Sequence, residues 1–348
     1  MRRATAVLVL AALLAVGGQA AGAAAQPRHG SRQEFKKVRV PPGMAVYQWR
    51  NAGDLTPAEV QRRLRFLRAN GFHTVYLEVG TYLEAGDRPA GDPVREPEMD
   101  RIRRQIRRFV ATASGLGLSV QALGGAPDWT QGPRDYLGEL LVELVADYNQ
   151  LVGRSERLKG VHLDLEPYTQ SGWLNEDVVE DNLAAYLTAV GRIVDTYRSR
   201  LGEPANRGLQ LGLAIPFWLD GRGDVPSVEF GDDNRKPAAY HLIDMFGDLP
   251  GAYLVIMAYR DFTRTSNGSI ALARDEFRYA AMTGARSGLV VGQHYGPAPE
   301  DEAHTTFHGQ PRWMFRRAAA EITLAFRRYR QFRGLAVDDV DAFMAAAP

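Results

Sequence analysis

The sequence contains no cysteine among its 348 residues, which excludes disulfides, a thiol nucleophile and a lipid-modified cysteine. An excess of charge of one sign is also lacking, since 42 Lys and Arg face 41 Asp and Glu, a formal net charge of +1. This balance argues against a nucleic acid or an anionic membrane as partner. No HxH or HExxH spacing occurs, so the motifs typical of zinc sites are missing. We therefore expect neither a metal nor a cofactor.

Apolar runs long enough to cross a membrane are also lacking. Residues 1–25 carry two arginines, a short apolar run and then small residues, which is the pattern of a signal peptide. A transmembrane anchor is the alternative, but 4–16 is too short to span a bilayer. Residues 26–40 are polar and predict a flexible leader. We expect a secreted or periplasmic monomer, without stable membrane insertion after signal cleavage, whose single domain is 41–348.

From Met44 onward, short apolar runs alternate with amphipathic stretches, which is typical of repeated βα units. Eight such units in about 300 residues predict an α/β fold, the (β/α)8 TIM barrel. An open doubly wound sheet is the alternative, but the even spacing of the units favours closure. The predicted strands are 44–49, 73–80, 118–125, 159–166, 209–218, 253–259, 289–295 and 334–340. The predicted helices are 56–70, 98–116, 134–151, 176–200, 240–246, 270–283 and 313–332.

The stretch 159–168, KGVHLDLEPY, places unusual residues on one strand. Side chains alternate between the faces of a strand, so His162, Asp164 and Glu166 share one face and the other face is aliphatic. Pro167 cannot donate to a sheet ladder, so we expect the strand to end at Glu166. Active sites of TIM barrels lie at this carboxyl-terminal end of the strands.

Two carboxyls two residues apart on one face lie close enough for their titrations to interact. One of them can then keep its proton near neutral pH, which glycosidic bond hydrolysis requires of its general acid. We therefore predict Glu166 as the acid and Asp164 as its partner. The structural alternative is a pair of carboxylates in salt bridges to barrel arginines.

Aromatic residues are predicted to gather at the same end of the barrel. Flat rings there suit sugars, because the C–H faces of a sugar stack on aromatic rings while its hydroxyls bind polar neighbours. Some rings could instead only fill contacts between loops and barrel. The candidates for binding a carbohydrate substrate are Trp49, Trp129, Tyr168, Trp218 and Tyr295.

Here a family resemblance becomes specific. The stretch 159–166 resembles the fourth-strand motif D-G-x-D-x-D-x-E of family-18 glycoside hydrolases, the chitinase-like barrels. Lys159 and His162 stand where the family has aspartates, while Asp164 and Glu166 match its last Asp and catalytic Glu. The strand-six motif Met-x-Tyr-Asp/Asn is matched by residues 257–259, but Arg260 follows.

The resemblance implies a mechanism in which the 2-acetamido group of the substrate attacks the anomeric carbon. Glu166 would then be the acid/base, Asp164 would orient the acetamido group, and Tyr259 would hydrogen-bond its carbonyl. The chain thus resembles a divergent chitinase-like hydrolase acting on an amino-sugar poly- or oligosaccharide.

Other positions refine the substrate prediction. The family commonly has a tryptophan at the end of strand eight, where this chain has Asp338 and Asp339, and carboxylates there favour a basic or deacetylated amino sugar. We predict substrate binding by Asp339 and by Glu78 at the tip of strand two, where a structural ion pair is the alternative. Gln293 in strand seven is expected to orient the substrate together with His294 and Tyr295. No Glu occurs in 289–299, which disfavours a strand-seven nucleophile.

Two further interpretations stay open from the sequence. His162, Asp164 and Glu166 could form a metal-dependent hydrolase, although metal-binding histidines usually come in pairs. His162 is otherwise expected inside the barrel, hydrogen-bonded to Asp164. A non-catalytic carbohydrate-binding barrel is the other alternative, because fold does not imply activity.

Overall fold

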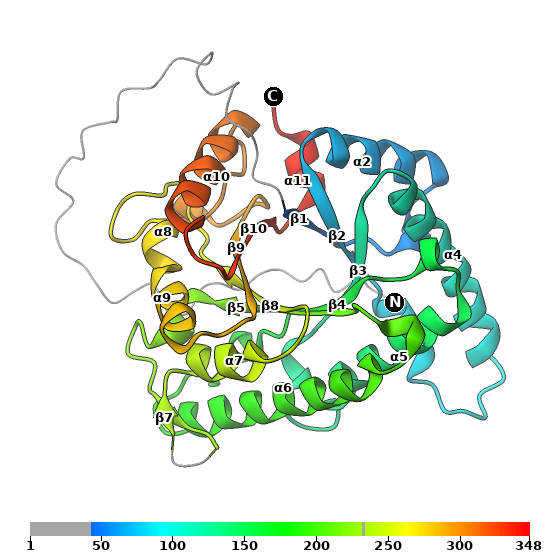
Figure 1. The fold of residues 1–348 in the computed structure, drawn as a ribbon, viewed down its shortest axis with the longest axis horizontal. Coiled ribbons are helices and arrows are strands. Elements are labelled where there is room, and N and C mark those ends of the chain that lie inside the picture. The colour runs from blue at the N-terminus through cyan, green and yellow to red at the C-terminus, as the bar shows by residue number, and fades with distance from the viewer. Residues whose placement is uncertain (1–42, 232–233) are drawn as a thin grey trace.

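The computed structural model describes residues 43–231 and 234–348. The predicted signal peptide, 1–25, and leader, 26–40, lie outside the described residues. The described part of the chain forms one closed parallel barrel with helices around it, so the predicted (β/α)8 fold is confirmed (Figure 1).

All eight predicted barrel strands are present. The barrel closes in the order β1-β10-β9-β8-β5-β4-β3-β2, so only β6 and β7 interrupt the sequence order, and they form a separate two-stranded ribbon. The barrel strands are β1 (Met44–Gln48), β2 (Phe72–Glu78), β3 (Ser119–Gly124), β4 (Gly160–Leu163), β5 (Gln210–Pro216), β8 (Ala252–Met257), β9 (Gly288–Gln293) and β10 (Phe332–Val337); the ribbon pairs β6 (Val228–Glu229) with β7 (Arg235–Lys236).

Helices surround the barrel and cover the outer face of its strands (Figure 1). They are α2 (Pro57–Ala69), α3 (Gly80–Gly86), α4 (Arg95–Gly115), α5 (Leu137–Leu151), α6 (Val179–Leu201), α7 (Ala238–Gly247), α8 (Ser269–Leu272), α9 (Arg274–Thr283), α10 (Arg312–Phe326) and α11 (Val340–Ala345). Thr56 caps α2: its hydroxyl accepts from the Glu59 amide, the Glu59 side chain accepts from the Thr56 amide, and Pro57 is the first helical residue.

The two faces of each strand enter different environments. Outward aliphatic residues such as Val161, Leu163 and Leu165 join the large core beneath the helices. Inward residues of several strands, including Tyr47, Tyr76 and Tyr253, fill the barrel with aromatic rings. This separation follows from the two-residue period of a strand.

His162 lies inside the barrel, as predicted, but its expected hydrogen bond to Asp164 is wrong. Its Nε2 pairs with the Tyr47 hydroxyl at 2.7 Å and its Nδ1 with the Tyr253 hydroxyl at 3.1 Å. Burial lowers the pKa of His162 to about 3, so the ring is neutral. A side chain on Gly212 would collide with it, since an added Cβ would lie 2.4 Å from His162 Nδ1.

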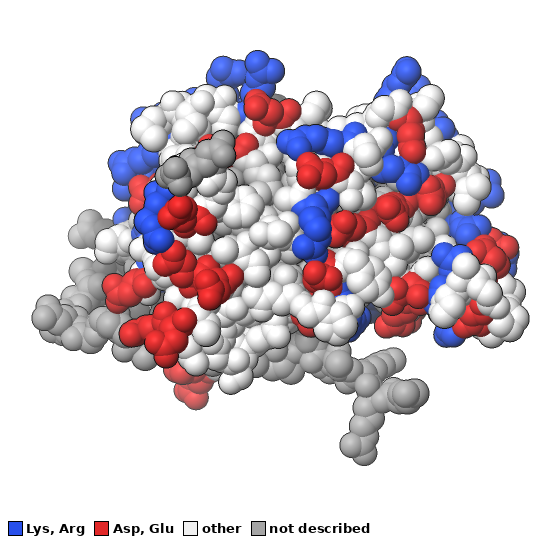
Figure 2. Space-filling view, turned by 90° about the horizontal axis from the view of Figure 1, so that it is seen from below, with Lys and Arg blue, Asp and Glu red and all other residues white. Residues whose placement is uncertain are grey.

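The surface carries charges of both signs. Figure 2 shows Lys and Arg side chains interspersed with Asp and Glu over the face it views. In the residues that the structure describes, no helix has the length and apolar character needed to cross a membrane.

Candidate active site at the carboxyl-terminal end of the barrel

The two carboxyls of the fourth-strand motif lie just beyond β4. Pairing in β4 ends at Leu163 rather than at Glu166, which corrects the predicted boundary. The backbone stays against β3 for one more step, because the Asp164 amide donates to the Gly124 carbonyl at 3.0 Å. Gly125 makes this close approach possible, since a Cβ there would lie 2.1 Å from the Asp164 carbonyl oxygen.

Four carboxyls interact at this end of the barrel: Asp164, Glu166, Glu78 and Asp338. Burial raises the pKa of Asp164 well above its usual range, and the charges of the other three raise it further. Burial also raises the pKa of Glu166, and the charge of Asp338 adds to this. At least one proton is therefore held within the cluster near neutral pH, because buried like charges cannot all ionise.

Tyr168 holds Glu166 in place. Its hydroxyl donates to Glu166 Oε1 at 2.8 Å, an interaction that lowers the Glu166 pKa and partly offsets its burial. The Tyr168 ring is itself fixed edge-on against Trp218, with centroids 4.9 Å apart, and against Trp173 at 6.4 Å. Predicted binding residues Tyr168 and Trp218 thus lie together beside the predicted acid.

Tyr259 faces the same cluster from the end of β8. Burial holds its pKa well above the usual value, and the charges of Asp338, Asp164 and Glu166 raise it further. The hydroxyl is therefore a neutral hydrogen-bond donor. Its ring stacks on His294 with centroids 5.4 Å apart.

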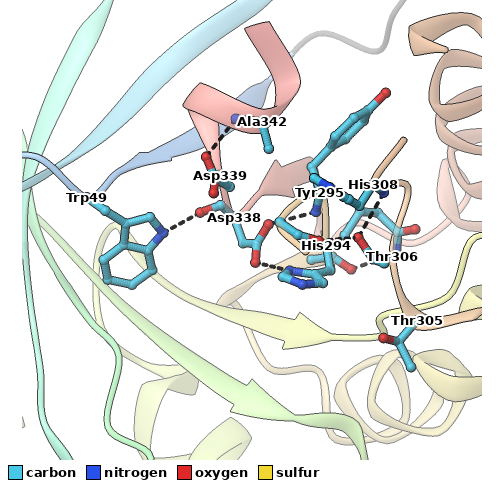
Figure 3. Close-up of polar contacts among 12 residues, drawn as sticks. Trp49, His294, Tyr295, Thr305, Thr306, His308, Asp338, Asp339 and Ala342 are labelled. Atoms are coloured by element: carbon cyan, nitrogen blue, oxygen red, sulfur yellow. Dashed lines mark hydrogen bonds and ion pairs between the residues drawn. The ribbon is translucent and has the colours of Figure 1, made fainter. Parts of the chain in front are cut away.

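Asp338 and His294 form a buried pair, a contact that was not predicted from the sequence (Figure 3). Asp338 Oδ2 pairs with His294 Nδ1, and its Oδ1 accepts from the Tyr295 amide at 2.8 Å. Burial lowers the pKa of His294, but the charge and hydrogen bond of Asp338 outweigh this and raise it overall. Asp338 therefore favours the protonated form of His294 beside the carboxyl cluster.

Trp49 stands at the mouth of the barrel, after β1. Its indole Nε1 donates to the Asp338 carbonyl oxygen at 2.5 Å, which orients the ring (Figure 3). The ring stacks on Tyr47, with centroids 5.5 Å apart, and keeps 41% of its surface exposed. A fixed and exposed indole is suited to stack on a sugar ring.

Glu78 lies at the end of β2, and its negative charge contributes to the raised pKa of Asp164. The Gly80 amide donates to its Oε1 at 2.7 Å, while burial raises its pKa to about 7. The alternative of a structural ion pair is not realised among the described residues, where the only carboxyl of this cluster in an ion pair is Asp338.

Four predicted binding residues lie elsewhere. Asp339 caps α11, since its Oδ1 accepts from the Ala342 amide at 2.9 Å (Figure 3). Gln293 is fully buried on the outer side of β9, where its amide donates to the Ala258 carbonyl at 3.0 Å. Tyr295 and Trp129 are both buried in the core under the helices. The side chains of Gln293, Tyr295 and Trp129 therefore do not join the carboxyl cluster. Burial raises the pKa of Asp339, which lies near enough for the charge of Asp338 to raise it further while its carboxylate is engaged at the cap.

The alternation of strand residues could have identified the missed pair. Ala336 points into the barrel and Val337 outward, so Asp338 rather than Asp339 continues the inward face. By the same rule, His294 points inward because it follows Gln293, which points outward. For the last strand, the sequence prediction selected Asp339, the neighbour of the residue that joins the cluster.

The departures from the family-18 motifs have structural roles. Arg260 is buried and donates to the Tyr259 carbonyl at 2.6 Å and to Asn267 Oδ1 at 3.0 Å, so it supports the loop after β8. His162 uses both ring nitrogens on tyrosines, which leaves it unable to join Asp164 and Glu166 in binding a metal. The metal alternative built on these three residues is therefore disfavoured.

Comparisons with known proteins show the fold. The catalytic domain of β-amylase from Paenibacillus polymyxa matches with a TM-score of 0.53 at 11% identity, covering 88% of this chain and 94% of that chain. A GH18 chitinase from Cycas revoluta, in complex with (GlcNAc)3, matches with a TM-score of 0.50 at 11% identity, covering 86% and 95%. No protein-family model and no curated protein matches the sequence. Both similar structures are glycoside hydrolase barrels, and the likeness does not single out family 18.

Proposed function

We propose that this protein is an exported glycoside hydrolase that cleaves an amino-sugar poly- or oligosaccharide, with Glu166 as general acid/base. One observation carries the proposal: Asp164 and Glu166 converge at the carboxyl-terminal end of a closed barrel with raised pKa values. Perturbed carboxyls in this position are typical of a general acid and its partner. The salt-bridge alternative lacks support, because no Arg or Lys pairs with either carboxyl among the described residues.

The reaction uses the proton that the cluster holds. The 2-acetamido N–H of the substrate donates to Asp164, which favours the ionised form of Asp164 and leaves the proton on Glu166. Glu166 gives this proton to the glycosidic oxygen as the acetamido oxygen bonds to the anomeric carbon and the leaving group departs. Tyr259 donates to the acetamido oxygen. Glu166 then takes a proton from the water that opens the cyclic intermediate.

The test is a panel of N-acetylated and deacetylated amino-sugar polymers, assayed for new reducing ends. Glu166→Gln keeps the size of the side chain and removes its proton transfer, so we expect turnover to fall about 10²- to 10⁴-fold. Glu143→Gln, on the exposed side of α5, is the matched control for the loss of one charge.

Two outcomes would contradict the proposal. If the wild type binds these sugars but releases no reducing ends, and Glu166→Gln binds equally well, the barrel is a carbohydrate-binding protein. If EDTA abolishes the activity, a metal-dependent mechanism replaces the carboxyl mechanism, which should be indifferent to chelation.

A further inference from the structure

The cluster contains four carboxyls, which is more than the hydrolysis of a neutral sugar needs. Asp164, Glu166, Glu78 and Asp338 interact, and among the described residues only His294 forms an ion pair with any of them. Asp164 Oδ1 is buried and accepts no hydrogen bond from a described group. Leaving buried carboxyls unpaired is costly, so this arrangement points to a cation supplied from outside the chain.

One buried carboxyl elsewhere in the protein is paired with a cation of the chain itself. The side chain of Asp220 is 2% exposed and pairs with Arg222, Oδ2 to Nε, at 2.8 Å. The cluster at the barrel mouth has no arginine or lysine in this role within the described residues. In the same part of the chain no group of three His, Cys, Asp or Glu is arranged to hold a metal ion.

Asp164 is assigned to the acetamido group of the cleaved sugar, so Glu78 is the cluster member left free to bind such a cation. Only its Oε1 is occupied, by the Gly80 amide, and no other described group donates to its carboxyl. Asp338 is held by His294 and the Tyr295 amide, and Glu166 is held by Tyr168.

Trp49 places a sugar-binding surface next to Glu78. Strands β1 and β2 are paired with Gln48 opposite Leu77, so the next residues, Trp49 and Glu78, lie side by side on neighbouring strands. Neighbouring strands are about 4.8 Å apart, which is within the width of one sugar ring. A sugar stacked on the exposed indole therefore brings its substituents to the Glu78 carboxyl.

We propose that the substrate carries a free 2-amino group, bound as an ammonium by Glu78 on the sugar that stacks on Trp49. This inference rests on the proposed function and deepens it: the substrate is a partially deacetylated amino-sugar polymer. The sugar at the cleaved bond keeps its acetamido group for Asp164, while the sugar at Trp49 is deacetylated. An ammonium donates hydrogen bonds and a positive charge to the cluster, whereas an acetamido group is neutral.

The experiment measures binding separately from catalysis. Glu166→Gln is titrated calorimetrically at neutral pH with tetrasaccharides of β-1,4-linked N-acetylglucosamine, of glucosamine, and of mixed N-acetylglucosamine and glucosamine. We expect the mixed tetrasaccharide to bind about 10- to 100-fold more tightly than the N-acetylated one, as for a hydrogen-bonded charge. In the Glu166→Gln protein, a second substitution Glu78→Gln should remove this preference for the mixed tetrasaccharide. The control substitution Glu143→Gln in the same protein should preserve it.

The outcomes separate this inference from the proposed function. If the wild type cleaves the N-acetylated tetrasaccharide through Glu166 and the preference for a free amine is absent or survives Glu78→Gln, this inference is overturned and the hydrolase remains. If no tetrasaccharide is bound or cleaved by any form of the protein, both are overturned.

Discussion

Replacing Glu276 with methionine should stabilise the protein, although it removes a charged residue from an apparently ordinary helix. Glu276 lies on α9, is fully buried, and neither of its carboxyl oxygens has a hydrogen-bond partner among the described residues. Leaving a buried polar group unpaired costs about 1–3 kcal/mol. Methionine fills the same volume without polar oxygens, so Glu276→Met should raise the free energy of unfolding by about that amount at neutral pH.

The stabilisation by Glu276→Met should depend on pH. Burial raises the pKa of Glu276 well above its ordinary value of 4.5, and the charge of Asp220 adds to this. The folded state therefore keeps a proton that the unfolded state has lost, and stability falls as the pH rises from 4.5 toward the raised pKa. The advantage of Glu276→Met should be smallest below pH 4.5 and grow with pH.

Urea unfolding of the wild type, Glu276→Met and Glu276→Gln at several pH values tests this. Glutamine keeps a buried polar group but cannot ionise. The free energy of unfolding of Glu276→Gln should therefore lie below that of Glu276→Met by an amount that does not change with pH. A Glu276→Met protein that is less stable than the wild type at every pH would refute the reasoning. It would mean that Arg222, whose charge favours the ionised form, stabilises the carboxyl more than burial destabilises it.

Three further predictions concern the candidate site. Tyr168→Phe removes the 2.8 Å hydrogen bond that lowers the Glu166 pKa. The alkaline limb of the pH–rate profile should therefore move to higher pH, and turnover should fall about 10- to 100-fold. An alkaline limb at unchanged pH would show that this hydrogen bond does not set the Glu166 pKa. Gly125→Ala places a Cβ 2.1 Å from the Asp164 carbonyl oxygen. The resulting displacement of Asp164 should lower kcat/KM on the order of 100-fold. Unchanged kinetics would show that the backbone adapts to the added Cβ. Asp339→Ala removes the N-terminal cap of α11 and should lower the free energy of unfolding by about 0.5–2 kcal/mol, with KM unchanged. A raised KM at unchanged stability would instead support the predicted role of Asp339 in substrate binding.

Local patterns in the sequence were enough to find the barrel. All eight strands were predicted within a few residues of their observed bounds, because a strand with one outward aliphatic face is recognisable from consecutive residues alone. The Thr56–Glu59 capping box of α2 is equally local, because its contacts span three residues. Short elements without such a pattern, α3 and α11, were missed, and the helix predicted over 270–283 is divided at Ala273 into α8 and α9.

The candidate site was predicted only in part, since its members come from different strands. Asp164 and Glu166 could be paired because they are neighbours on one strand. Trp129 and Tyr295 were expected at the mouth because they follow strands, yet both rings turn outward into the core. Position at a strand end does not by itself decide the direction of a side chain; for Tyr295 the alternation of β9 does, because Tyr295 shares the outward face with Gln293.

The sequence by itself determined the eight strands, which of their faces are aliphatic, and the placing of two carboxyls on one inward face, since each of these depends on residues close together in the chain. Only the tertiary structure decided that Glu78 and Asp338 join Asp164, that His294 pairs with Asp338, and that His162 binds tyrosines instead. Barrel closure brings β2, β4, β9 and β10 to one mouth. The stagger of strands far apart in sequence then sets which side chains meet, and no local pattern encodes that stagger.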